Sequence, residues 1–136
     1  MKNGTKAHFA VLTPPGRGGI AVIRVQGPAA IQALGEIFRP SKKDLTRFQP
    51  GRIYYGHIHD ANGRVLDEVI VSITNASAPA EALDINCHGG SAAVQAVGAR
   101  LAELGIERRS ADDLNALAGI DPITRAAMRL LPVQAT

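Results

Sequence analysis

The clearest pattern in the chain is two alternating segments joined by a short polar turn. Residues 52–59 alternate apolar and polar positions around Ile53, Tyr55 and Ile58, and residues 65–73 resume the pattern. The residues between them include Asp-Ala-Asn-Gly, a composition typical of tight turns between antiparallel strands. The sequence therefore predicts a β-hairpin over residues 52–73.

Three further runs rich in β-branched and apolar residues predict strands over 8–12, 20–25 and 83–87. The first ends at a Thr-Pro-Pro turn, and the second follows directly after a glycine-rich loop. The third is followed by His-Gly-Gly. Glycine and proline thus mark the boundaries of all three strands.

Apolar residues at three- and four-residue spacing predict helices in the other segments. One helix is expected to have Pro28 at its first position and to stop before Pro40. A second is expected to start at Ser91 and to close at Gly105. Shorter helices are expected to start at Ser110 and Asp121. The predicted inward residues of the first two helices are Ile31, Leu34, Ile37 and Phe38, and Val94, Val97, Leu101 and Leu104.

Most of the strands precede most of the helices, which favours an α+β fold over alternating βαβ units. We therefore expect a mixed or antiparallel sheet with helices packed on it. A chain of 136 residues can bury one core, so we expect a single domain over 1–136.

Composition and charge narrow the possible partners. The net charge is +3, and five of the fifteen basic residues lie in residues 39–52 beside a single acid, Asp44. This basic segment is interpreted as an exposed linker, with contact to phosphate as the alternative. Aromatic residues make up only 4% of the chain, so no extended stacking platform for bases is expected. The single cysteine and the lack of a long apolar run predict a cytoplasmic protein with no membrane contact.

Residues 13–19 form a rigid, glycine-rich loop. Gly16, Gly18 and Gly19 let backbone N–H groups approach a ligand closely, and Arg17 and Arg24 add cationic side chains. An anionic ligand would suit this loop, although a plain glycine turn between two strands is the alternative. A dinucleotide site is disfavoured, because that fingerprint must open a helix and strand-forming residues follow here.

His88, Gly89 and Gly90 form a second glycine-rich junction, this time between a strand and a helix. Free N–H groups and the positive end of a helix meet there, so it is a second candidate anion site that could share a pocket with the first. The P-loop pattern is absent from the sequence, so no nucleotide site of that type is expected.

Catalytic and metal-binding residues are not assigned. Cys87 and His88 are neighbours in a strand and must face opposite sides, so they cannot act as a nucleophile and its base. His57, His59 and His88 lack a carboxylate at ligand spacing, and we expect no metal.

Three blocks of sequence together resemble a known family. They are TPPGRGGIAVIRVQGPAA, DEVIV at 67–71 and DINCHGG at 84–90. They are similar to the N-terminal domain of the tRNA-modification GTPase family MnmE, also called TrmE, over about residues 10–103. The resemblance implies a fold like that of the tetrahydrofolate-binding aminomethyltransferase of glycine cleavage, a homodimer, and binding of formyl-tetrahydrofolate. It also implies that the whole enzyme, with a flavoprotein partner of the MnmG/GidA kind, modifies the wobble uridine of tRNA.

The resemblance also assigns residues. Arg24 matches the family arginine that contacts folate, and the two glycine loops match the family's motif loops. The family loop Ser-Tyr-Thr-Gly-Glu-Asp has a glutamate that meets the pterin, whereas residues 77–81 read Ser-Ala-Pro-Ala-Glu, with Ala80 at that position and Glu81 next to it. The implied cofactor-binding residues are Gly16, Arg17, Gly18, Gly19, Arg24, Glu81, His88, Gly89 and Gly90.

Other parts of the family pattern are missing from this sequence. The family's Pro-Gly-Glu-Phe-Thr segment is replaced by RRSADDLNALAG, so residues 105–136 are expected to form a divergent helical end. Neither a GTPase domain nor the C-terminal cysteine motif is present, so the chain is not expected to be an enzyme on its own. We expect a folate-binding and dimerisation module. The alternatives are a degenerate dimerisation scaffold that no longer binds folate and, less favoured, a folate-dependent methyl transferase.

Overall fold

The computed structural model describes residues 7–12, 19–42, 47–88 and 90–117. The helix predicted to start at Asp121 lies outside the described residues, as do Gly16, Arg17, Gly18 and Gly89 of the two glycine loops. The predicted α+β class is confirmed, because the described residues form one mixed sheet with helices packed on it.

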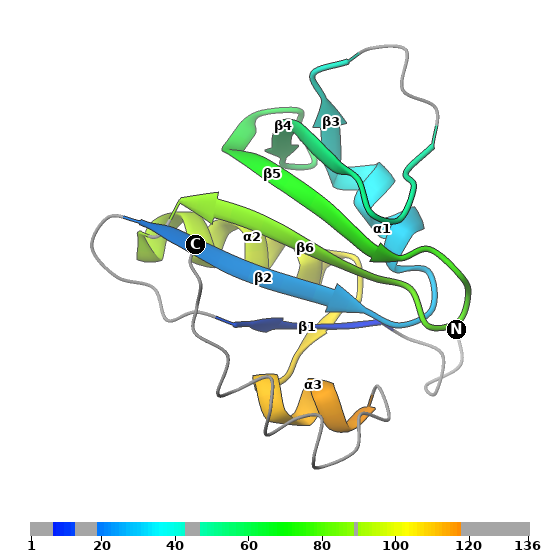
Figure 1. Cartoon of the computed structure of the whole chain (residues 1–136). Coiled ribbons are helices and arrows are strands. Elements are labelled where there is room, and N and C mark those ends of the chain that lie inside the picture. The colour runs from blue at the N-terminus through cyan, green and yellow to red at the C-terminus, as the bar shows by residue number, and fades with distance from the viewer. Residues whose placement is uncertain (1–6, 13–18, 43–46, 89, 118–136) are drawn as a thin grey trace.

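The sheet has the strand order β3-β4-β5-β6-β2-β1-β7 (Figure 1). Neighbouring strands are antiparallel except for β1 and β7, which are parallel. Strands β2 and β6 lie near the middle and pair along their whole length. The strands are β1 (His8–Val11), β2 (Ile20–Gln26), β3 (Phe38–Pro40), β4 (Ile53–His59), β5 (Val65–Asn75), β6 (Ala82–His88) and β7 (Glu107–Arg108).

The predicted hairpin is confirmed as the antiparallel pair β4 and β5. The inward face of β4, however, is formed by Gly56 and Ile58, whereas Ile53 and Tyr55 are 58% and 61% exposed. Residues five apart cannot share a face of a regular strand, so Ile53 and Ile58 must point to opposite sides. The prediction of an alternating strand was therefore correct, but the three residues named for it do not all lie on one face.

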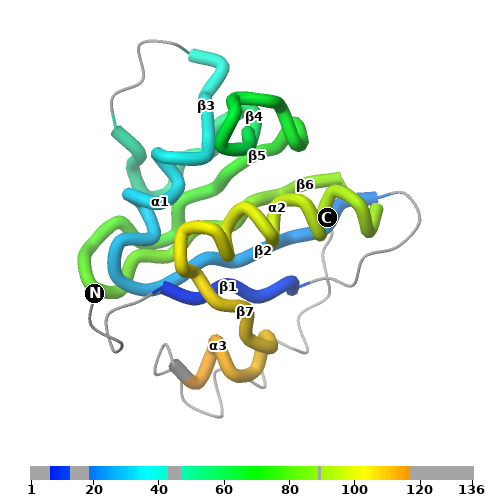
Figure 2. The backbone as a smooth tube through the Cα atoms, turned by 180° about the vertical axis from the view of Figure 1, so that it is seen from behind, coloured from blue at the N-terminus to red at the C-terminus, as the bar shows by residue number. Residues whose placement is uncertain are grey.

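Two helices cover one face of the sheet, α1 (Ala30–Ile37) and α2 (Ser91–Glu103) (Figure 2). A third, α3 (Ala111–Leu117), lies beside β1 on the other side, where Ala10 and Leu114 are both buried. Helix α2 starts at Ser91 as predicted, and Gly105 follows it with a φ of 85°. Ser110 caps α3, because its Oγ accepts the Asp113 N–H at 3.1 Å.

The start and the end of α1 differ from the prediction. Pro28 lies before the helix and Ala29 is its N-cap, with a left-handed φ of 68°, so proline does not occupy the first helical position. Phe38 was expected on the helix but is extended and begins β3. Residue 39 precedes a proline, which disfavours a helical conformation there, and β4 offers hydrogen-bond partners instead. Neither β3 nor β7 was predicted.

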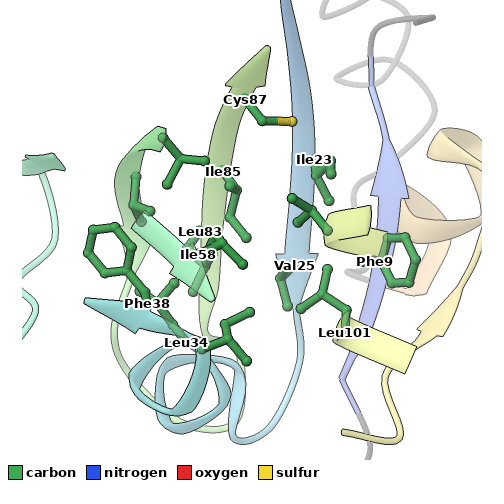
Figure 3. Close-up of a cluster of buried hydrophobic side chains, with 14 of the residues drawn as sticks. Phe9, Ile23, Val25, Leu34, Phe38, Ile58, Leu83, Ile85, Cys87 and Leu101 are labelled. Atoms are coloured by element: carbon green, nitrogen blue, oxygen red, sulfur yellow. The ribbon is translucent and has the colours of Figure 1, made fainter. Parts of the chain in front are cut away.

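The core lies between the sheet and helices α1 and α2. Alternate residues of the two central strands fill it, with Ile23 and Val25 from β2 and Leu83, Ile85 and Cys87 from β6 pointing into one cluster (Figure 3). Leu34 and Leu101 close the cluster from the two helices. Because strand side chains alternate, the other residues of β2 and β6 project to the opposite face.

Gly56 is the position in the hairpin at which we expect the least tolerance. A Cβ there would meet the Arg39 carbonyl oxygen of β3 and would lie 2.8 Å from the Phe38 ring. We expect Gly56→Ala to lower the free energy of unfolding by roughly 2–3 kcal/mol, measured by urea denaturation. The matched control is Gly35→Ala in α1, where a Cβ meets nothing within 4 Å and should stabilise the helix by roughly 0.5–1 kcal/mol. Equal effects of the two substitutions would contradict the packing at β3.

Candidate functional site

The face of β2 and β6 opposite α1 and α2 carries most of the polar candidates. We call it the open face, and it consists of Val22, Arg24 and Gln26 of β2 and Asp84, Asn86 and His88 of β6. These residues alternate with the buried residues of the same strands, which explains why they share one side. Helix α3 borders this face, because the Gln26 Nε2 donates to the Leu114 carbonyl oxygen at 2.7 Å.

Arg24 is held in a fixed orientation at the middle of the open face. It lies directly opposite Asp84 in the strand pairing, with its Nε 2.8 Å from Oδ1 and its Nη2 3.0 Å from Oδ2. This fork is the bidentate geometry that suits guanidinium and carboxylate groups. Hydrogen bonding to Asp84 raises the pKa of Arg24, so the side chain is always charged. No hydrogen bond joins its Nη1 group to a described residue, so this group is a candidate donor to a ligand.

The two predicted glycine loops meet at one end of this face. Ile20 pairs with His88, so the chain leaving the first loop at Gly19 lies beside the chain entering the second loop. Gly19 has a φ of 75°, a conformation that favours glycine, and Gly90 caps α2. The strands therefore bring the described parts of the two loops together.

His88 is oriented by a carboxylate from the next strand. Its Nδ1 lies 2.6 Å from the Asp67 Oδ1, and its backbone N–H donates to the Asp67 Oδ2 at 3.0 Å. The imidazole is 67% exposed, whereas the Asp67 side chain is 10% exposed. The carboxylate thus fixes the ring, and no hydrogen bond joins its Nε2 to a described residue. His88 and Arg24 are four positions apart along the paired strands, roughly 13 Å, so a ligand that touches both must be elongated.

Glu81 is positioned elsewhere, at the opposite end of β6. Its Oε1 accepts the Ile31 N–H at 3.0 Å and its Oε2 accepts the Ala29 N–H at 3.3 Å. The N-cap Ala29 has no side chain that could satisfy these amides, so Glu81 caps α1 from outside the helix and is 8% exposed. The structure does not bring Glu81 together with Arg24 and His88, and its contact with folate stays a prediction.

Three residues of the site were not singled out from the sequence. Asp84 lies opposite Arg24, and Asn86 lies between Asp84 and His88 on β6, where its Nδ2 donates to the Ile70 carbonyl oxygen at 3.1 Å. Their alternation with Ile85 and Cys87 would have indicated a shared face with His88. Asp67 lies on another strand, and no local pattern links it to His88.

Cys87 faces the core, on the side of β6 opposite to the exposed His88. It is 2% exposed, its Sγ lies 3.6 Å from the Ala21 carbonyl oxygen, and burial raises its pKa to about 11. In the described part of the chain, no three His, Cys, Asp or Glu side chains are grouped closely enough to hold a metal ion. The described helices are also too short or too polar to cross a membrane.

Comparisons with known proteins agree on one family. The family model described as "GTP-binding protein TrmE N-terminus" matches residues 7–113. A tRNA modification GTPase MnmE of Carboxydothermus hydrogenoformans is 43% identical over 108 residues, covering 71% of this chain and 23% of that protein. Proteins of the same name from Bacillus subtilis and Moorella thermoacetica are 42% and 44% identical over 108 residues, covering 71% of this chain and 24% and 23% of their own lengths. The chain thus spans about a quarter of the length of the curated relatives it matches.

The cap of α1 can be tested by substitution. Glu81→Ala leaves two amides without a charged acceptor, so we expect the free energy of unfolding to fall by roughly 1.5–3 kcal/mol in urea denaturation. Glu36→Ala, at an exposed position of the same helix, should change it by less than about 0.5 kcal/mol. The capping role would be wrong if both substitutions had the same small effect.

The buried thiol predicts a pH dependence of stability. The pKa of Cys87 is about 11 in the folded protein against 9.0 as the ordinary value, so the unfolded chain releases its proton first. The thiol's contribution to stability is fully present below pH 9 and is lost as the pH rises towards 11. We expect the protein to lose stability relative to Cys87→Val over this range, measured by urea denaturation at several pH values. Parallel curves for the two proteins would contradict the burial of the thiol.

Proposed function

The chain belongs to the family of TrmE N-terminal domains, and on this premise we propose that it is the folate-binding and homodimerisation module of a tRNA modification GTPase. The observation that carries the proposal is the Arg24 side chain, which Asp84 holds on the open face while its Nη1 group has no hydrogen-bond partner among the described residues. The proposed ligand is formyl-tetrahydrofolate, which supplies a one-carbon unit when bound.

The residues of the open face fit such a ligand. A folate is elongated and ends in carboxylates, and the open face presents donors over roughly 13 Å, from Arg24 to His88. Arg24 would donate from Nη1 to a carboxylate or to the polar edge of the pterin. Because Asp84 already fixes the guanidinium, little side-chain entropy is lost when the ligand binds.

The end of the face near the glycine loops would hold the anionic part of the ligand or its polar edge. The exposed His88 ring is oriented by Asp67, and Gly90 begins α2, whose N-terminus carries a partial positive charge. Gly16, Arg17, Gly18, Gly19 and Gly89 complete the proposed set as loop residues. In this proposal the main role of Glu81 is to cap α1. It reaches a ligand only if the loop before β6 moves.

The wider activity is proposed from the relatives. They are tRNA modification GTPases, and this chain corresponds to about a quarter of their length. We place the module in the cytoplasm, as part of an enzyme that modifies the wobble uridine of tRNA with a flavoprotein partner of the MnmG/GidA kind. Its own contribution would be to dimerise and to bind folate.

A second candidate function is a dimerisation scaffold that has lost folate. It is favoured by the loop before β6, where Ala80 takes the place of the family glutamate and the neighbouring Glu81 is committed to the Ala29 and Ile31 amides. Such a protein would keep the same fold and dimer and would not bind the ligand.

Calorimetric titration with formyl-tetrahydrofolate distinguishes the two functions. We expect Arg24→Ala to weaken binding by at least about tenfold, because it removes a charged donor. Asp84→Asn should weaken it less, since the arginine remains and only its orientation is loosened. Arg108→Ala is the matched control, because this exposed arginine lies on the edge strand β7, two strands away from β2. Light scattering of each protein reports the oligomeric state.

The proposed folate site would be refuted by a folded dimer that releases no heat with the ligand, and this result would support the scaffold. Equal loss of binding in Arg24→Ala and Arg108→Ala would refute the role of Arg24. A folded monomer would refute the dimerisation shared by both functions.

A further inference from the structure

A hollow separate from the open face lies at the beginning of β4. Its volume is about 380 Å³, and its lining includes Lys42, Arg47, Arg52, Gln49, Tyr54 and Tyr55. Strands β5 and β6 lie between β4 and β2, so the hollow is roughly 14 Å or more from Arg24 across the sheet. We call it the β4 pocket.

All the charged residues among the described lining of the β4 pocket are positive. Lys42, Arg47 and Arg52 are all exposed, and none of them forms an ion pair with a described residue. In contrast, Arg24, Arg100 and Arg109 each have a carboxylate partner. Three cations without a carboxylate partner among the described residues create a positive potential around one concave surface, and phosphate is one of the anions whose geometry arginine forks match.

The walls of the pocket are held by contacts with the sheet. The Tyr54 hydroxyl accepts the Gln49 N–H at 2.8 Å, and the Phe48 and Tyr54 rings meet edge to face at 5.1 Å. The Ser41 N–H donates to the Tyr55 carbonyl oxygen at 2.8 Å on the other side. The segments that carry the described cations are therefore anchored to β4.

The residues that line the pocket also include an exposed aromatic residue. Tyr55 is 61% exposed, on the face of β4 that turns away from the core. Aromatic residues are few in this chain, too few to form an extended platform on which several bases could stack. One exposed tyrosine in a pocket that three cations also line is nevertheless enough to stack a single base while the cations hold nearby phosphates.

We infer that the β4 pocket binds the sugar-phosphate backbone of RNA, with Tyr55 stacking on an unpaired base. The inference rests on the proposed function, because tRNA modification is what supplies an RNA partner. A small phosphorylated molecule offers the same phosphate chemistry, but exposed cations spread over an open pocket suit a chain of phosphates better than a single one. The distance from Arg24 allows RNA and folate to be bound at the same time.

The test measures binding of unmodified tRNA to the 136-residue chain by fluorescence anisotropy over a series of salt concentrations. We expect the double variant Arg47→Gln/Arg52→Gln to bind at least about tenfold more weakly. Its slope of log affinity against log salt should be smaller by roughly 0.7–0.9 for each lost phosphate contact. Tyr55→Ala should weaken binding by at least about fivefold with the slope unchanged.

The matched control is Arg64→Gln/Arg108→Gln, which removes two exposed cations from the β4–β5 turn and from β7. If this control weakened tRNA binding as much as Arg47→Gln/Arg52→Gln, only general charge would be at work, and the inference would be overturned. Inorganic phosphate and a mononucleotide are the competing probes. Displacement of tRNA by either at submillimolar concentration would assign the pocket to a small phosphorylated molecule and overturn the RNA assignment.

Titration with formyl-tetrahydrofolate separates this inference from the proposed function. Folate binding without tRNA binding would overturn the inference and leave the proposed folate site standing. Binding of tRNA that depends on the β4 pocket, in a protein that ignores folate, would support the inference and refute the folate site. Circular dichroism melting curves equal to that of the unsubstituted chain show that the variants fold, because all the substituted side chains are exposed.

Discussion

The antiparallel pairing of β2 with β6 is the constraint on which the rest of the molecule depends. It runs from Ile20 opposite His88 to Gln26 opposite Ala82 and joins segments about sixty residues apart in the chain. One register fixes three things at once. It aligns the buried residues of both strands under α1 and α2, it sets Arg24 opposite Asp84, and it brings the ends of two glycine loops side by side. A slip of one residue would turn every one of these side chains to the wrong face.

Core and candidate site are therefore interleaved residue by residue in the same strands. Cys87 is buried among apolar side chains, while His88 next to it is exposed and bound to Asp67. We expect changes on one face of β6 to affect stability and, in the proposed function, changes on the other face to affect ligand binding. This separation of the two faces is less clear just before β6, where Glu81 is bonded to the backbone at the start of α1.

Signals that are local in the sequence were sufficient for much of the fold. The β4–β5 hairpin, helix α2 with its closing Gly105 and the Ser110 cap all depend on residues within a few positions of one another, and all were predicted. Strands β3 and β7 were not, because a strand of two or three residues exists only by virtue of the partner beside it. For the same reason the sequence indicated Arg24 and His88 but not the carboxylates of Asp84 and Asp67, which contact them from other strands.

The outermost strands of the sheet have a consequence for assembly. Strand β3 has three residues and ends at Pro40, which has no N–H to donate, and β7 has two residues. Strands this short give an incoming strand almost no ladder to continue, a protection that sheet proteins use against edge-to-edge aggregation. Among the described residues the long strands β5 and β6 are both shielded by neighbours on each side. Among the described residues, the edges of the sheet therefore give two copies of this chain little backbone to pair edge to edge, which favours association through side chains over a continuous sheet.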